Sequence, residues 1–423
     1  MIQALKKLWR DRRGNTLVIA AGALPLVIGS AGLATDTIQW ALWKRQLQRA
    51  ADSAALAGVH SIVYKEGTRT EVVNAVNRDL THNNHVGITT TKDYVGQPTS
   101  GAYAADPYAV QVTVSVQKKL SFSSIFLSSV PKITTSATAT VVATGKYCVI
   151  SLENTTATGI SYTGNATVDL GCGMATNSKG ANAIDAGGSS QVNASPISAV
   201  GGIPDSDNYA DGTTIQQYGM KQKDPYATIN APTTGFNPCA NDPNVGPSDP
   251  AVTLTAGCYK NMRLSGDVTL GDGTYIIDGG NFDVGSQAKI SCNSCTIILT
   301  NKSTATNAQI GTVNINAGAT INMTAQTTGT YAGLLFYQDR RAVDGNGANF
   351  QNLINGNASS SFTGAFYFPN QQVYLTGTSG MNTNCVQMVA RRVNFSGDTD
   401  ITNTCPTGWP KPNFEGQMIR LVA

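Results

Sequence analysis

The chain has 423 residues, of which 13% are charged and 43 are glycine. Ordinary soluble domains average about 25% charged residues, whereas this composition, rich in glycine, serine, threonine and asparagine, favours an exported β-rich protein with many tight turns. The formal net charge of +3 arises mostly in residues 1–14. Because no basic stripe lies beyond them, we expect no nucleic-acid partner, and the length allows two or three domains.

Residues 16–34 form an apolar run without a formal charge. As a helix this run reaches about 28 Å, close to the thickness of the hydrocarbon core of a bilayer. A carboxylate at mid-membrane costs roughly 2.5 to 3.5 kcal/mol, so the predicted transmembrane helix ends with Asp36 in the far interface.

Basic residues dominate the segment before the run, where Asp11 is the one acidic residue. By the positive-inside rule this places the amino terminus in the cytoplasm and exports the chain beyond residue 36. A cleaved signal peptide is the alternative, but the apolar run is longer than a usual h-region. The predicted topology signal consists of Lys6, Lys7, Arg10, Arg12 and Arg13.

The helical pattern continues beyond the run as "TIQWALWKRQLQRAADSAALAGV", without a polar break. We therefore predict one helix of about forty residues, half in lipid and half outside. Ala50, Ala54 and Gly58 form a stripe of small residues that permits close helix packing. Packing against a sheet of the same chain explains the stripe equally well.

The motifs "RDRRGN" and "KRQLQRAADSAALAG", with the apolar run and Asp36 between them, resemble the amino-terminal segment of TadG-like proteins of the Tad (Flp) pilus-assembly system. The resemblance covers about residues 10–58. It implies a non-enzymatic, single-pass protein of the bacterial inner membrane with a periplasmic or surface-exposed carboxyl-terminal part, and it implies pilin or other pilus-assembly subunits as partners. Ile19 stands where a processed pilin carries Glu, so pilin-type cleavage is not implied.

Residues 1–58 thus form the predicted cytoplasmic stub, membrane helix and extension, and residues 59–146 are predicted to be a small α+β domain similar to pilin-like folds. We expect a helix over 68–83 and strands over 86–95, 108–116 and 132–143. The valines at 110, 112, 114 and 116 alternate with polar residues, which predicts a half-buried antiparallel sheet. The segment "KKLSFSSIFL" is either amphipathic or a plain connection.

Residues 147–423 show short apolar triplets separated by Gly, Asn, Asp and Ser. The stretches 164–175 and 188–199 align at a fixed offset, with Val168 matching Val192 and Ala175 matching Ala199. A repeat of this length predicts an all-β domain of parallel β-helix or similar solenoid type, and a β-sandwich is the alternative. Residues 201–250, rich in Pro, Asp, Asn and Gly, are expected to be a loop-rich excursion.

All eight cysteines lie in the part predicted to be exported, where an even number indicates disulfides. We expect sequential pairing, although sequence alone does not fix the connectivity. A redox or metal role for the C-x-x-C motif is the alternative, but its β-branched flanks do not fit a helix start. The expected pairs are Cys148 with Cys172, Cys239 with Cys258, Cys292 with Cys295, and Cys385 with Cys405.

The competing function is a membrane-tethered β-helix enzyme acting on polysaccharide. All three histidines precede the β-rich region, which removes a His-dependent site from it. The four aspartates of 267–283 could form a carboxylate pair or a calcium site, but their spacing beside glycine fits turn chemistry. We therefore predict no catalytic residue, cofactor or metal. Two arginine pairs, 340–341 and 391–392, are candidates for contact with a surface glycan or protein receptor.

Overall fold

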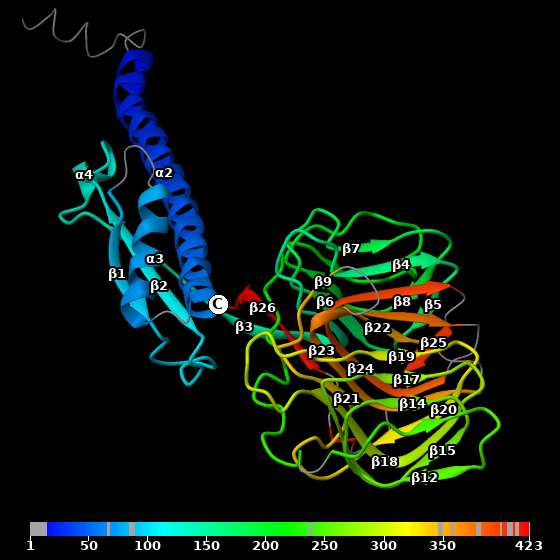
Figure 1. Cartoon of the computed structure of the whole chain (residues 1–423). Coiled ribbons are helices and arrows are strands. Elements are labelled where there is room, and N and C mark those ends of the chain that lie inside the picture. Colours follow the sequence, from blue (N-terminus) through cyan, green and yellow to red (C-terminus); the bar gives the residue numbers. More distant parts are fainter. Residues whose placement is uncertain are drawn as a thin grey trace, which may run out of the picture. The chain divides into compact units, whose positions relative to one another are not determined.

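The computed structural model describes residues 15–422 apart from 66–67, 84–88, 237–238, 346–349, 356, 358, 378–381, 398–399, 404–408 and 411–413. The chain divides into two compact units, residues 1–142 with 419–423 (unit 1) and residues 143–418 (unit 2). As expected, a long apolar helix is followed by a largely β-rich body (Figure 1).

Unit 1 begins with α2 (Asn15–Lys65), a single helix of 51 residues that continues without a break through Pro25. The second helix, α3 (Arg69–His82), starts at a capping box in which Thr68 and Glu71 satisfy each other's backbone N–H groups. Val72 and Val76 are buried, so the face of α3 that carries them lies against the core of the unit. A short helix, α4 (Ser123–Phe126), lies between the second and third strands.

The sheet of unit 1 is antiparallel. Strand β2 (Val110–Gln117) pairs with β1 (Thr91–Gly96) on one side and with β3 (Lys132–Ser151) on the other. The four alternating valines of β2 are almost fully buried and pack with α2 and α3 in one core. The predicted alternation is confirmed on that side, but Ser115 on the opposite face is also buried. Val422 adds to this unit by donating its N–H to the carbonyl of Thr138.

Unit 2 is built from mostly short strands, with β18, β23 and β24 longer, and the strand pairs described within it are parallel. With β3 and β26 (Phe414–Leu421) crossing the borders between the units, these strands are β4 (Ile160–Gly164), β5 (Thr167–Asp169), β6 (Gly173–Thr176), β7 (Ile184–Ala186), β8 (Gln191–Asn193), β9 (Ile197–Ala199), β10 (Ile215–Gln216), β11 (Asn244–Val245), β12 (Val252–Leu254), β13 (Gly257–Tyr259), β14 (Met262–Leu264), β15 (Asp267–Leu270), β16 (Gly273–Asp278), β17 (Phe282–Val284), β18 (Lys289–Thr300), β19 (Val313–Ile315), β20 (Thr320–Ala325), β21 (Leu334–Gln338), β22 (Gln351–Ile354), β23 (Ser361–Gly377), β24 (Asn382–Gly397) and β25 (Asp400–Asn403).

The first three strands that lie wholly within unit 2 pair in order with the next three. Strands β4, β5 and β6 lie beside β7, β8 and β9, and Val168 pairs with Val192 as the sequence repeat predicts. The predicted match of Ala175 with Ala199 is wrong by one residue, because Ala175 pairs with Ser198. The turn before β9 is therefore one residue shorter than the turn before β6.

The order of the strands in the ladder of unit 2 differs from their order in the chain. Strand β24 pairs with β23 on one side and with β3 and β4 on the other. The first strands of the unit therefore lie in the middle of the ladder. The chain proceeds to one end at β10, and the segment between β10 and β11 carries it to the opposite end. From β11 the strands return until β24 and β25 close against β3, β4 and β5.

The interior of unit 2 is a continuous apolar cluster to which nearly every strand contributes. Val313, in β19, is fully buried there, whereas Val343, in a connection of the same unit, is 55% exposed. Truncating valine to alanine at both positions therefore compares the loss of a buried side chain with the loss of an exposed one.

We predict that Val313→Ala lowers the free energy of unfolding of unit 2 by roughly 2 kcal/mol, from lost burial and the cavity left behind. Val343→Ala is the matched control and changes it by less than about 0.5 kcal/mol. Chemical denaturation of the full chain in detergent measures both. Equal effects of the two substitutions would contradict the described core.

Candidate functional site

The amino-terminal half of α2 presents apolar side chains that the described residues leave uncovered. Leu26, for example, is 75% exposed. Among the residues that the structure describes, α2 is the one helix long and apolar enough to cross a membrane. An uncovered apolar surface of this length favours an apolar surrounding, where a helix satisfies its own backbone groups. The other large exposed apolar residues of this half are Val18, Ile19, Leu24, Val27, Ile28 and Leu33.

The carboxyl-terminal half of α2 is covered on one face by the rest of unit 1. Ala50 and Ala54 are buried, and a methyl group on Gly58 would lie 2.8 Å from Val110 Cγ1 and 3.2 Å from Val76 Cγ2. The stripe of small residues therefore brings α2 close to α3 and β2 of its own chain. Of the two explanations that the sequence leaves open, the structure favours packing within the chain.

At the junction of the two halves lies Asp36, which is only 5% exposed. Its Oδ2 accepts the backbone N–H groups of Phe122, at 3.1 Å, and Ser123. One turn earlier, Gly32 faces the ring of Phe122, which occupies the space that a side chain at 32 would need. The sequence predicted Asp36 only as the end of the span and left residues 118–127 as either an amphipathic segment or a plain connection. No local pattern could link the two, because Asp36 is separated from Phe122 by 86 residues and from Ser123 by 87.

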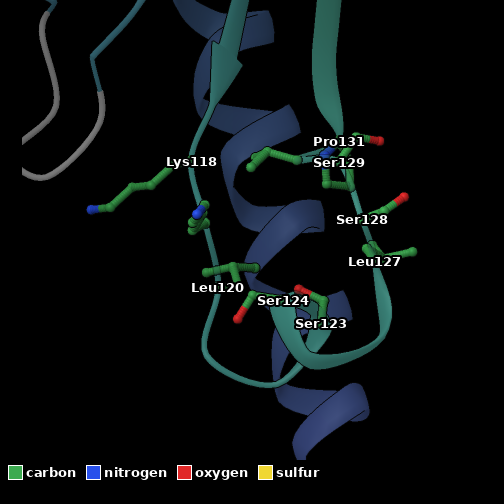
Figure 2. A pocket seen from close by; sticks show the side chains of 10 residues that line it. Lys118, Leu120, Ser123, Ser124, Leu127, Ser128, Ser129 and Pro131 are labelled. Atoms are coloured by element: carbon green, nitrogen blue, oxygen red, sulfur yellow. The ribbon is translucent and has the colours of Figure 1, made fainter.

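The connection from β2 to β3, which carries α4, forms a pocket of about 190 Å³. Figure 2 shows its two arms, residues 118–120 and 127–131, with Ser123 and Ser124 at the turn between them. Ser128 and Ser129 add hydroxyl groups to the lining, and Lys118 and Lys119 are exposed at its rim. The pocket is therefore rich in hydrogen-bond donors and carries positive charge.

The arginine pairs proposed as partner contacts are engaged within unit 2. Arg392 NH1 lies 2.7 Å and Arg391 Nε 3.1 Å from Oε2 of Glu153, and both arginines also pair with Asp344. Glu153 is fully buried. Burial alone would raise its pKa, but hydrogen bonds from Thr155 and from the two arginines outweigh burial and hold the pKa at about 2.

The other pair is occupied in the same way. Arg340 donates to the backbone carbonyls of Tyr226 and Ile229, and Arg341 forms a 2.8 Å ion pair with Asp339. The arginines thus hold strands and the loop-rich segment of unit 2 together. The expectation that they face a glycan or receptor gains no support from their surroundings.

Three disulfides join the sequential cysteine pairs Cys148–Cys172, Cys239–Cys258 and Cys292–Cys295. The last lies within the long strand β18, away from any helix start. Of the predicted fourth pair, Cys385 is buried at β24, and Cys405 lies outside the described residues. The predicted topology signal, Lys6, Lys7, Arg10, Arg12 and Arg13, also lies outside them.

The aspartates weighed as a carboxylate or calcium site have separate surroundings. Asp267 lies 3.9 Å from Lys289, whereas Asp278 accepts the N–H of Lys302. Asp283 is half-buried, and burial raises its pKa. Across the part of the chain that the structure describes, no group of three His, Cys, Asp or Glu side chains is placed to hold a metal ion.

Comparison with known protein families gives a match that falls on α2. Residues 14–61 match the family model described as "Putative Flp pilus-assembly TadE/G-like". The match spans the exposed apolar half of α2, Asp36 and the stripe of small residues. No curated protein and no solved structure matches the chain.

We predict that Ala54→Leu destabilises unit 1 by roughly 1 to 3 kcal/mol, because extra methylene groups overpack the junction of α2 with its neighbours. Ala41→Leu, at an exposed position of the same helix, is the control and leaves stability nearly unchanged. Denaturation followed by the fluorescence of tryptophan, with buried Trp43 in the same core, measures the difference. A stable Ala54→Leu variant would mean that the stripe is not packed within the chain.

At pH 7 we predict that Glu153→Gln lowers the free energy of unfolding of unit 2 by about 3 kcal/mol, because it removes the buried partner of two arginines. The pKa of Glu153 is about 2 in the folded chain, against an ordinary value of 4.5. Its contribution is therefore fully present above about pH 4.5 and is lost as the pH falls toward 2.

The difference between wild type and Glu153→Gln should accordingly shrink as the pH falls through that window. Exposed Glu415→Gln is the matched control in the same unit and should behave like the wild type. Denaturation midpoints measured from pH 7 to pH 2.5 provide the comparison. A constant difference across the window would contradict the assignment.

Proposed function

We propose that the protein is a single-pass envelope protein of the Tad/Flp pilus-assembly class with a structural, non-enzymatic role in pilus biogenesis or surface attachment. The observation that carries the proposal is the uncovered apolar half of α2, located in the segment that matches the TadE/G-like family. We place the anchor in the bacterial inner membrane with the amino terminus in the cytoplasm, on the basis of the five basic residues before the span. The rest of the chain is then periplasmic or surface-exposed.

The proposed organisation has three parts: the anchor helix, a small α+β domain, and a β-rich domain. We infer that the β-rich domain is a parallel β-helix. In support, its described ladders are parallel and pair residues one coil apart, as with Ile160 and Ile184, which are separated by 24 residues. A sandwich of antiparallel sheets would not produce such ladders.

The partners in this proposal are the inner membrane and other pilus-assembly or pilin subunits. We do not include a glycan or receptor, because the arginines that suggested one have acidic or carbonyl partners within unit 2. The β-rich domain then serves as a rigid body for assembly, held together by parallel ladders and disulfides.

Leu26→Arg should prevent stable anchoring, because a charge at the centre of the span costs roughly 2.5 to 3.5 kcal/mol. Leu42→Arg, at an exposed position of α2 beyond Asp36, is the matched control. The readout is the fraction of protein that resists alkaline carbonate extraction from membranes. We expect a clear loss for Leu26→Arg and wild-type retention for Leu42→Arg.

The same variants test the biological role in a strain from which the gene is deleted. Deletion should reduce surface pili and attachment, and the wild-type gene and Leu42→Arg should restore them, whereas Leu26→Arg should not. Normal pili in the deletion strain would contradict the proposed role. Full restoration by a non-anchored Leu26→Arg protein would contradict the importance of the anchor.

A further inference from the structure

The connection between β2 and β3, residues 118–131, forms a projection that we call the β2–β3 finger. It is fixed to α2 at the end of the apolar run, through the ring of Phe122 on Gly32 and the bonds of Asp36 to the start of α4. In Figure 1, α4 lies beside the part of α2 that leads to the amino-terminal half. The depth of the span in the bilayer therefore determines how far the finger lies from the membrane surface.

Gly32 falls in the last turn of residues 16–34, and Asp36 lies one turn further, at about 1.5 Å per residue. If α2 spans the bilayer, Phe122 and α4 are therefore at the boundary between hydrocarbon and headgroups. The opposite end of the sheet, where β1 joins β2, is about 26 Å away along the eight residues of β2.

The tip of the finger leaves apolar side chains largely exposed. Ile125 is 72% exposed and Leu127 is 45% exposed. Exposed apolar residues at a loop tip are unfavourable in water, but they suit the boundary between headgroups and acyl chains.

Positive charge and hydroxyl groups accompany these apolar residues. Lys118 and Lys119 are exposed at the base of the finger. Ser123, Ser124, Ser128 and Ser129 line its pocket (Figure 2). Lysine ammonium groups attract anionic lipid surfaces, and hydroxyl groups donate hydrogen bonds to phosphate oxygens.

We propose that the β2–β3 finger binds the phospholipid headgroups of the leaflet from which α2 emerges. Ile125 and Leu127 enter the interface, while Lys118, Lys119 and the serine-lined pocket contact headgroup phosphates. The inference rests on the proposed membrane span. A bilayer is favoured over a protein partner because the finger is held against the end of the span and combines an apolar tip with basic residues. With the finger and α2 both bound, unit 1 has a fixed height and tilt on the membrane.

The test uses the full chain reconstituted in vesicles of phosphatidylethanolamine and phosphatidylglycerol. A fluorophore is attached to Ile125→Cys, or to the control Ala102→Cys in the β1–β2 connection, under non-reducing conditions that keep the disulfides closed. Both positions are exposed, so neither substitution removes a core contact. Iodide quenches fluorophores in water, and lipids with nitroxide on the acyl chain quench those in the interface.

We expect iodide quenching to be several-fold weaker at position 125 than at 102, with lipid nitroxide quenching only at 125. In vesicles of phosphatidylcholine alone, or with Lys118→Gln and Lys119→Gln together, the protection at 125 should decrease. Equal iodide quenching at 125 and 102 in carbonate-resistant protein would contradict the proposed lipid contact of the finger but not the membrane anchor. Extraction of the protein by carbonate would overturn the anchor itself. Unchanged protection in the double lysine variant would overturn the headgroup contact.

Discussion

The structure depends on an apolar helix surface that the described part of the chain does not cover. Half of α2 is packed into the core of unit 1, and the other half exposes leucine, isoleucine and valine along a length that matches a bilayer. In water this surface would cost too much to remain exposed. In the proposed membrane span lipid removes the cost, and because both halves belong to one helix of 51 residues, the span and unit 1 are joined by continuous helix.

In unit 2 the corresponding constraint is the satisfaction of strand edges. Unpaired backbone groups at an exposed edge favour association with other chains. If the strands simply followed one another in chain order, the first strands of the unit would lie at such an edge, whereas in the observed order the ends of the ladder lie at β10 and β11. Instead, β24 pairs with β3 and β4 and so joins the last strands of the unit to the first. The segment between β10 and β11 makes this order feasible, and Arg340 holds it through the carbonyls of Tyr226 and Ile229.

Local patterns in the sequence predicted a large part of this. The apolar run and its extension indicated the helix, the alternating valines indicated β2, and the repeat indicated the pairing of Val168 with Val192. Each of these depends on residues close in the sequence or on a regular period. The closure of β24 on β3 could not be found in this way, because Met388 and Val149 pair across 239 residues without any periodic relation. Glu153 is similarly far in the sequence from Arg391 and Arg392, so sequence alone could not show that it pairs with these arginines.

The depth of α2 in the bilayer is the most direct test of the account. Nitroxide labels at successive exposed positions from 18 to 42, in the full chain in vesicles, report collisions with oxygen, which concentrates in lipid, and with a water-soluble nickel complex. We predict high oxygen and low nickel accessibility up to about Ala34, with the two profiles crossing near Asp36. Nickel accessibility along the whole helix would contradict a transmembrane anchor and the role assigned to it.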